Sequence, residues 1–316
     1  MRARQRLLLR VFALPFFGER VRKEGELMCG QRIPAWLSGA LVVGAFAALF
    51  VLERRRPLRH EVESKLTRGA RNLAVAGVGA VALQLTESPV AFSLTALVER
   101  HELGLLKRLP LPAWLEVALA VLLLDYTLYV WHVLTHKVPF LWRFHVAHHV
   151  DLDLDASTAL RFHFGELVVS VPWRAGQIVL LGVSPLAFSV WQTLLLLSIL
   201  FHHSNVRLPA GAERRLNHLI VTPRMHGIHH SVVREETDSN WSSGLTVWDR
   251  LHGTLRLNVP QDEITIGVPA YREPGEIGLV KVLVMPFTEQ RPAWQLPDGG
   301  TPVRAASPVS ADHLLP

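Results

Sequence analysis

Five long apolar runs are the feature that most constrains how this chain folds. A helix needs about 20 mostly apolar residues to cross the hydrocarbon core of a bilayer. Each run approaches that length, and hydrophobic residues make up 49% of the 316-residue chain. We therefore expect an all-α protein, built as a polytopic bundle of membrane helices. The runs cover residues 36–52, 73–98, 113–131, 167–183 and 186–201.

The second of these runs contains residues that are costly in lipid. Glu87 and Pro89 lie inside the second run, where they predict a kink or a shallow break. The last two runs are joined near Ser184 and Pro185, and we expect them to form a hairpin that enters and leaves on one face of the membrane. A further apolar run at 278–287 is too short to span.

The basic residues predict an orientation and a division of the chain. The net charge is +6, and E-R-R-R-P-L-R directly follows the first run, so the loop up to Arg71 is expected to be cytoplasmic. Residues 1–35 are also basic, which conflicts with that topology unless translation starts at Met28. We expect a membrane domain over 36–290 and a disordered tail over 291–316, which is rich in Pro, Ala and Ser.

Charge and cysteine content exclude two classes of protein. The basic segments flank apolar helices, so they are expected to lie near anionic lipid and not to bind nucleic acid. The single cysteine, Cys29, rules out an intramolecular disulfide framework.

Histidines gather in groups with helical spacing. Residues three or four apart lie on one face of a helix, so each group is expected to present its rings together. F-H-H-S-N adds His202 and His203 between the second and third groups. The three groups are His132 with His136, His145 with His148 and His149, and His226 with His229 and His230.

The number of imidazoles points to two metal ions. Neutral imidazole is the commonest protein ligand for metals and suits zinc, copper, iron and nickel. A structural zinc site needs only about four ligands, whereas these groups supply roughly ten. The groups follow the ends of apolar runs, so we expect a helical cap rich in histidine at the cytoplasmic face of the membrane.

The spacings H-x3-H, H-x2-H-H and a second H-x2-H-H resemble those of the fatty acid hydroxylase / sterol desaturase family of membrane di-iron enzymes. T-P-R-M-H-G-I-H-H-S, followed by D-S-N-W and W-D-R-L-H-G-T-L, is similar to the family's C-terminal signature. The resemblance covers about residues 50–290. His252 departs from it, because the family usually has phenylalanine there, and we do not expect His252 to be a ligand.

The resemblance implies two iron ions, although affinity alone does not favour iron over zinc. It implies no catalytic residue beyond the metal centre. His163, in R-F-H-F, and His202 are weaker candidates, and Asp125, Asp238 and Asn205 are expected to support the ligands from outside. The implied metal ligands are His132, His136, His145, His148, His149, His203, His226, His229 and His230.

The reaction implied by the resemblance is attack on a lipid C–H bond with dioxygen and external electrons. Hydroxylation is the leading outcome and desaturation the alternative; a protein of another class, which binds or transports metal without catalysis, also stays open. The chain has no dinucleotide, haem or iron–sulfur motif, so a separate reductase, ferredoxin or cytochrome is expected to donate electrons. The expected location is a bacterial inner membrane.

Overall fold

The computed structural model describes residues 32–304, and these residues form helices joined by loops. Within that range the only β pairing consists of isolated bridges, such as Ile220 with Leu245, so the all-α prediction is confirmed. The basic segment up to residue 31, including Met28, lies outside the described residues, as do residues 305–316 of the expected tail.

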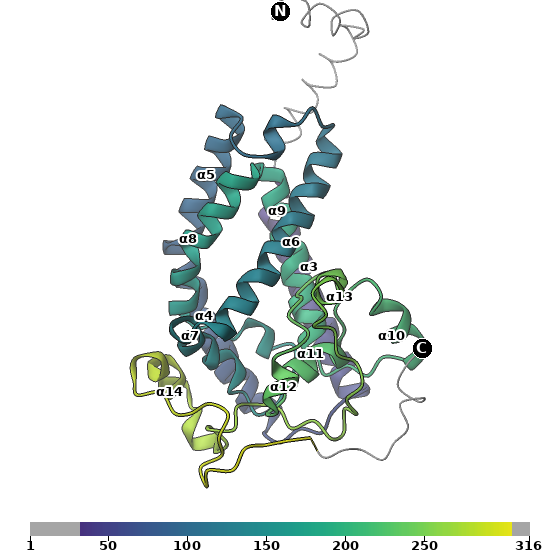
Figure 1. Cartoon of the computed structure of the whole chain (residues 1–316), viewed down its shortest axis with the longest axis vertical. Helices are drawn as coiled ribbons and strands as arrows, with labels where there is room; N and C mark the ends of the chain where they lie inside the picture. The colour runs from purple at the N-terminus through teal and green to yellow at the C-terminus, as the bar shows by residue number, and fades with distance from the viewer. Residues whose placement is uncertain (1–31, 305–316) are drawn as a thin grey trace, which may run out of the picture.

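Long helices run side by side along the long axis of the molecule (Figure 1). Five segments of the described chain are long and apolar enough to cross a membrane, as expected. Most of them extend a few residues beyond the apolar runs because they continue into polar ends. They are α3 (Ala35–Arg55), α4 (Lys65–Leu85) continued by α5 (Glu87–His101), α6 (Ala113–Lys137), α8 (Phe164–Leu181) and α9 (Pro185–His203).

The predicted break in the second span lies at Thr86, which separates α4 from α5. Glu87 begins α5 and is buried, with 6% of its surface exposed. Its carboxylate lies 3.3 Å from the guanidinium of Arg174 in α8. A buried charge is costly in lipid unless it is paired, so this contact explains why the chain tolerates both residues within spans.

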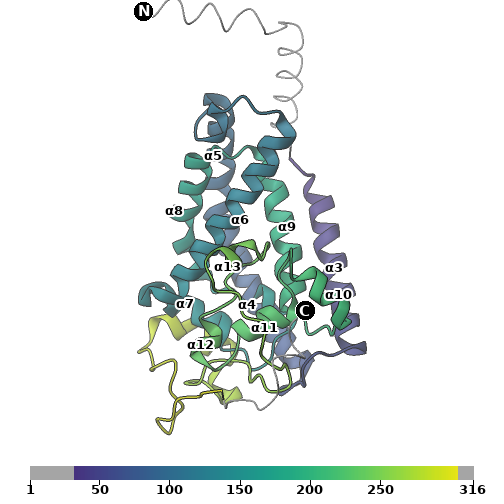
Figure 2. The same ribbon diagram turned by 45° about the vertical axis from the view of Figure 1, so that its right-hand side comes forward.

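Short helices and loops cover one end of the bundle, and we call residues 139–163 and 204–304 the cap (Figures 1 and 2). The run at 278–287 forms α14 and η4, which pack on α7 and α4 and do not span. The cap contains α7 (Pro139–His149), η2 (Thr158–Leu160), α10 (Ala210–Leu216), α11 (Pro223–His229), α12 (Arg234–Thr237), α13 (Val247–Leu251), η3 (Pro274–Glu276), α14 (Leu279–Val284) and η4 (Met285–Phe287). A further turn, η1 (Leu106–Arg108), precedes α6.

A buried ionic network fastens the cap to α4. Arg68 donates to Asp151 at 2.9 Å and also pairs with Asp155. Arg161 donates to the side chain of Asn72 at 2.6 Å and to the carbonyl of Ala147 in α7 at 2.9 Å. Breaking a buried ion pair typically costs about 3–5 kcal/mol, so these contacts hold the loop after α7 firmly.

Residues 291–304, where composition predicts a disordered tail, contact other parts of the cap. The ring of Trp294 stacks on Trp142 with centroids 5.6 Å apart. Arg304 pairs at 2.9 Å with Glu236, which is fully buried. The stacking of Trp294 and the ion pair of Arg304 attach this stretch to the rest of the cap.

Candidate metal centre

Eight histidines form two groups in which one nitrogen of each ring lies within 4.8 Å of the others. Helices α6, α7 and α11 supply the first group; α7, α9 and the end of α11 supply the second. We call His132, His136, His149 and His229 group A, and His148, His203, His226 and His230 group B.

The adjacent pairs of histidines divide between the groups. His148 and His149 belong to B and A, and His229 and His230 belong to A and B. The rings of each triplet lie together, with centroids 4.7 to 5.4 Å apart, but the adjacent pair is shared between the two groups. Successive residues of a helix point about 100° apart, because one turn takes about 3.6 residues. An H-x2-H-H run thus serves two neighbouring sites at once.

The ring nitrogens of both groups fit a metal ion. In group B the Nε2 atom of His203 lies 3.0 Å from those of His148 and His226, and the Nε2 atoms of His226 and His230 are 3.1 Å apart. Two ligands about 2.1 Å from one cation, at right angles, would be about 3.0 Å apart. In group A, Nε2 of His149 and Nε2 of His229 are buried without any protein partner. A buried polar atom without a partner is costly, and a cation would remove that cost.

Backbone carbonyls orient three of these rings. Nδ1–H of His132 donates to the carbonyl of Trp241 at 2.7 Å, and that of His229 donates to Ser239 at 2.9 Å. In group B, His203 donates to Ile199 at 2.8 Å. A ring that donates through Nδ1 keeps the lone pair on Nε2, so each contact prepares Nε2 for a metal.

The family model described as fatty acid hydroxylase matches residues 117–254, which include all eight histidines. Residues 117–254 belong to the fatty acid hydroxylase family.

Curated relatives carry similar segments. The chain is 32% identical to ornithine lipid hydroxylase OlsE of Rhizobium tropici over 183 residues, which is 57% of this chain and 52% of that protein. It is 30% identical to human alkylglycerol monooxygenase over 142 residues, 45% of this chain and 30% of that protein. It is 26% identical to rat cholesterol 25-hydroxylase over 163 residues, 51% and 53% of the two chains. The chain spans about half the length of these relatives, or less, and no solved structure matches it.

His145 lies beside group A of the fatty acid hydroxylase segment but outside the set of four. Its ring centroid is 4.8 Å from that of His136 and 5.0 Å from that of His149. Its Nδ1–H donates to the carboxylate of Glu166 at 2.9 Å, and its Nε2 is buried without a protein partner. Glu166 is thus the carboxylate that orients a histidine here. Glu166 lies three residues after His163, in the first turn of α8, but spacing alone did not identify it.

The two carboxylates expected to support the ligands contact residues other than histidine. Asp125 accepts from the backbone N–H of Leu245 at 3.0 Å and from the indole of Trp248 at 2.7 Å. Asp238 pairs with Lys137 at 2.7 Å. Neither has a hydrogen bond to a histidine within the described part of the chain. Their support of the ligands therefore stays a prediction, whereas Glu166 contacts a histidine ring directly.

Asn205 also lacks a contact with the histidines among the described residues. It accepts from the backbone N–H of Arg59 at 2.8 Å and donates to the carbonyl of the same residue at 2.9 Å. It therefore joins the loop after α3 to the loop after α9. Its expected role in supporting the ligands stays a prediction, and the contacts seen here are those of a bridge between two loops.

The two weaker candidates for metal ligands, His163 and His202, lie in different surroundings. His163 caps α8: its Nδ1 accepts from Gly165 at 2.9 Å, and its Nε2 pairs with the carbonyl of Leu283 at 3.0 Å. It lies outside both groups because its nitrogens serve the backbone. His202 is buried, and its ring centroid is 4.1 Å from that of His226, so it adjoins group B. His252 stacks on Tyr129 at 5.0 Å, away from either group, in line with its exclusion.

Burial keeps the cap histidines in their metal-binding form. Loss of solvent lowers the pKa of His148, His149, His226 and His230 well below the usual value, and neighbouring imidazoles lower it further. Burial also lowers the pKa of His229, to about 3. These rings are therefore neutral near pH 7, and only a neutral imidazole offers a lone pair to a metal.

Proposed function

We propose that this chain is a membrane di-iron monooxygenase that hydroxylates a C–H bond of a lipid with dioxygen and external electrons. The observation that carries the proposal is the pair of buried four-histidine groups at one end of a bundle of membrane-length helices. The names of the relatives, a lipid hydroxylase, a cholesterol hydroxylase and an alkylglycerol monooxygenase, support a lipid substrate.

Groups A and B would each hold one iron, with His145 and His202 available beside them. The groups adjoin: the rings of His149 and His230 stack with centroids 4.2 Å apart. When bound, a pair of irons supplies the oxidising power that attack on an unactivated C–H bond requires. Zinc in the purified protein would not exclude this, because affinity alone does not select iron.

The protein's own contribution is to position the rings and to exclude water. Trp241, only 2% exposed, packs with its ring centroid 4.7 Å from that of His136. Trp131, Leu141 and Phe144 pack around Glu166, and the space between them is too small for a water molecule. We propose that the lipid reaches the histidines from the bilayer, so its chain stays in apolar surroundings until it meets the metal centre.

The proposed orientation has the cap in the cytoplasm. Arg54, Arg55 and Arg56 are exposed where α3 ends at the cap, in accord with the excess of basic residues on cytoplasmic loops. Electrons would then come from a separate cytoplasmic donor. The histidines lie at the ends of spans and in the cap, which favours an enzyme over a transporter, since a transporter would need ionisable groups at mid-membrane depth.

The test compares cells that express wild-type protein, His136→Ala or His218→Ala, where His218 is an exposed control. We expect purified wild type and His218→Ala to hold two irons per chain and consume oxygen when reduced. Lipid extracts should contain a species heavier by one oxygen atom, absent with His136→Ala. A species lighter by two hydrogens would establish the desaturase instead. Unchanged lipids and no oxygen uptake would leave the non-enzymatic alternative.

A further inference from the structure

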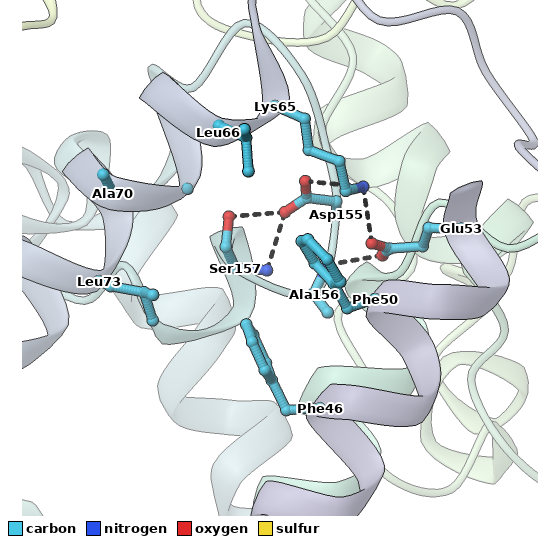
Figure 3. Close-up of a pocket in the computed structure, with 11 residues that line it drawn as sticks. Phe46, Phe50, Glu53, Lys65, Leu66, Ala70, Leu73, Asp155, Ala156 and Ser157 are labelled. Atoms are coloured by element: carbon cyan, nitrogen blue, oxygen red, sulfur yellow. Dashed lines mark hydrogen bonds and ion pairs between the residues drawn. The ribbon is translucent and has the colours of Figure 1, made fainter.

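A groove of about 310 Å³ separates α3 from α4, although these helices follow each other in sequence (Figure 3). Helix α3 packs on α9, whereas α4 packs on α8 and α5, so the two helices diverge. Both are candidate membrane spans, and α3 is largely exposed. The groove therefore faces the bilayer, where a gap between helices is filled by lipid and not by water. Its apolar wall consists of Phe46, Phe50, Leu66, Gly69, Ala70 and Leu73.

The polar end of the groove is neutralised internally. The ammonium of Lys65 lies 2.8 Å from Glu53 and 3.3 Å from Asp155 (Figure 3). Lys65 is therefore already paired with acidic groups and is not available to a carboxylate or phosphate. The interior of the groove suits a hydrocarbon chain alone.

Positive charge lies beside the groove, where α3 ends. Arg54, Arg55 and Arg56 are exposed where α3 ends, and the guanidinium of Arg54 lies 4.7 Å from the ring centroid of Phe50. Arginine forms bidentate hydrogen bonds with phosphate, and anionic headgroups attract basic residues at a membrane surface. The combination of an apolar groove with exposed arginines beside it matches a phospholipid.

We propose that this groove binds one acyl chain of an anionic bilayer phospholipid, with its phosphate at Arg54, Arg55 and Arg56. The occupant is a bound lipid and not the substrate. The Glu53 carboxylate accepts from the backbone N–H groups of Ala156 at 2.8 Å and Asn205 at 2.9 Å, so this network closes the groove off from His203. The bound chain fills the space between α3 and α4, next to the loop that follows α9. This assignment does not depend on the oxidation reaction.

The first experiment fills the groove. A Cβ added at Gly69 would meet no atom within 4 Å, so Gly69→Leu extends into the groove without a clash. Gly77 lies on the same helix with equally open space but outside the groove lining, so Gly77→Leu is the matched control. The full chain is reconstituted with equal phosphatidylglycerol and phosphatidylcholine, and retained lipid is measured by native mass spectrometry.

We expect wild type and Gly77→Leu to retain phosphatidylglycerol, and Gly69→Leu to retain roughly tenfold less, since each displaced methylene weakens apolar binding about fourfold. Replacing Arg54, Arg55 and Arg56 by Gln should remove the preference for phosphatidylglycerol over phosphatidylcholine. Equal retention in Gly69→Leu and Gly77→Leu would overturn the groove assignment. An unchanged preference in the triple variant would overturn the headgroup assignment.

Metal content and turnover are measured on the same samples, which separates this proposal from the proposed function. If lipid retention depended on Gly69 but the protein had no oxygenase activity, the groove proposal would be supported and the proposed function would be wrong. Recovery of an oxidised lipid as the molecule displaced by Gly69→Leu would make the groove a substrate site and overturn the proposal.

Discussion

Groups A and B use the same ligand type but are held by different parts of the fold. In group A, two rings are oriented by the carbonyls of Ser239 and Trp241, which lie in a cap loop. In group B, His203 is oriented by Ile199 of its own helix, α9. Group B is buried throughout, whereas His136 of group A is only half-buried. The comparison indicates that the cap loop orients the rings of group A, whereas helix α9 orients His203 of group B.

The loop that orients group A is itself strongly fixed. Asp249 is fully buried and accepts from the backbone N–H groups of Trp241 at 2.8 Å and Ser242 at 3.0 Å. Asn240 adopts a positive φ of 54°, and its side chain donates to the carbonyls of Met225 and Arg256. Hydrogen bonds thus join the D-S-N-W and W-D motifs. A change in either motif is expected to disturb the rings of group A before those of group B.

The largest effect is expected from removal of a ring in group B. His203→Ala deletes the Nε2 atom that approaches both His148 and His226, so metal content should fall from two ions toward one and turnover by more than about 100-fold. Plasma mass spectrometry of the purified protein measures the metal, and lipid product measures turnover. His101→Ala, at an exposed position on α5, is the control. If His203→Ala retained two metal ions, His203 would not be a metal ligand.

The next effect tests the partner of His145. Glu166→Gln weakens the acceptor for Nδ1–H, and loss of such a partner lowers metal affinity by about 10–100-fold. The affinity of group A for its ion should fall, and the affinity of group B should not change. Competition with a chelator measures both affinities, and Glu116→Gln, in the same bundle but paired with Lys107, is the matched control. Equal weakening of both ions would mean that His145 serves the two groups alike.

A smaller effect is expected from the cap loop. Asp249→Asn keeps the shape of the side chain but weakens two backbone hydrogen bonds, which loosens the carbonyl of Trp241. We expect release of the group A ion to accelerate about tenfold, with group B unchanged. Stopped-flow chelation resolves the two rates. If release from group B accelerated instead, the cap loop would not be what orients group A.

The smallest effect concerns the ordered part of the C-terminal segment. Trp294→Ala removes the stacking on Trp142, whose ring centroid is 4.9 Å from that of His136. Such aromatic pairs contribute about 1 kcal/mol, so the melting temperature should fall by a few degrees at most. Metal content should stay at two ions. A large loss of metal from group A would instead give the segment a role in holding His136.

Much of the architecture follows from local patterns. Apolar runs of membrane length predicted the five spans, and Glu87 marked the break between α4 and α5. Spacings of three and four residues identified the histidines that gather at the cap. These features are local, because helix formation and the face that a residue occupies depend on near neighbours in sequence.

The supporting contacts did not follow from the sequence. Asp125 and Asp238 are near the histidines in the chain but contact Leu245, Trp248 and Lys137. Glu166, 21 positions after His145, accepts from that ring. The carbonyl of Trp241 reaches His132 across 109 positions. Any carbonyl is an equal candidate in the sequence, so only packing decides which one meets an imidazole.

By itself, the sequence determined an all-α membrane protein with many imidazoles at the ends of its spans, because hydropathy and helical periodicity are properties of short segments. Tertiary structure alone decided how those rings divide. His148 and His149 are neighbours in the chain but belong to different groups. The turn of the helix separates their directions by about 100°, and the positions of α6, α9 and α11 around α7 then determine which rings each one meets.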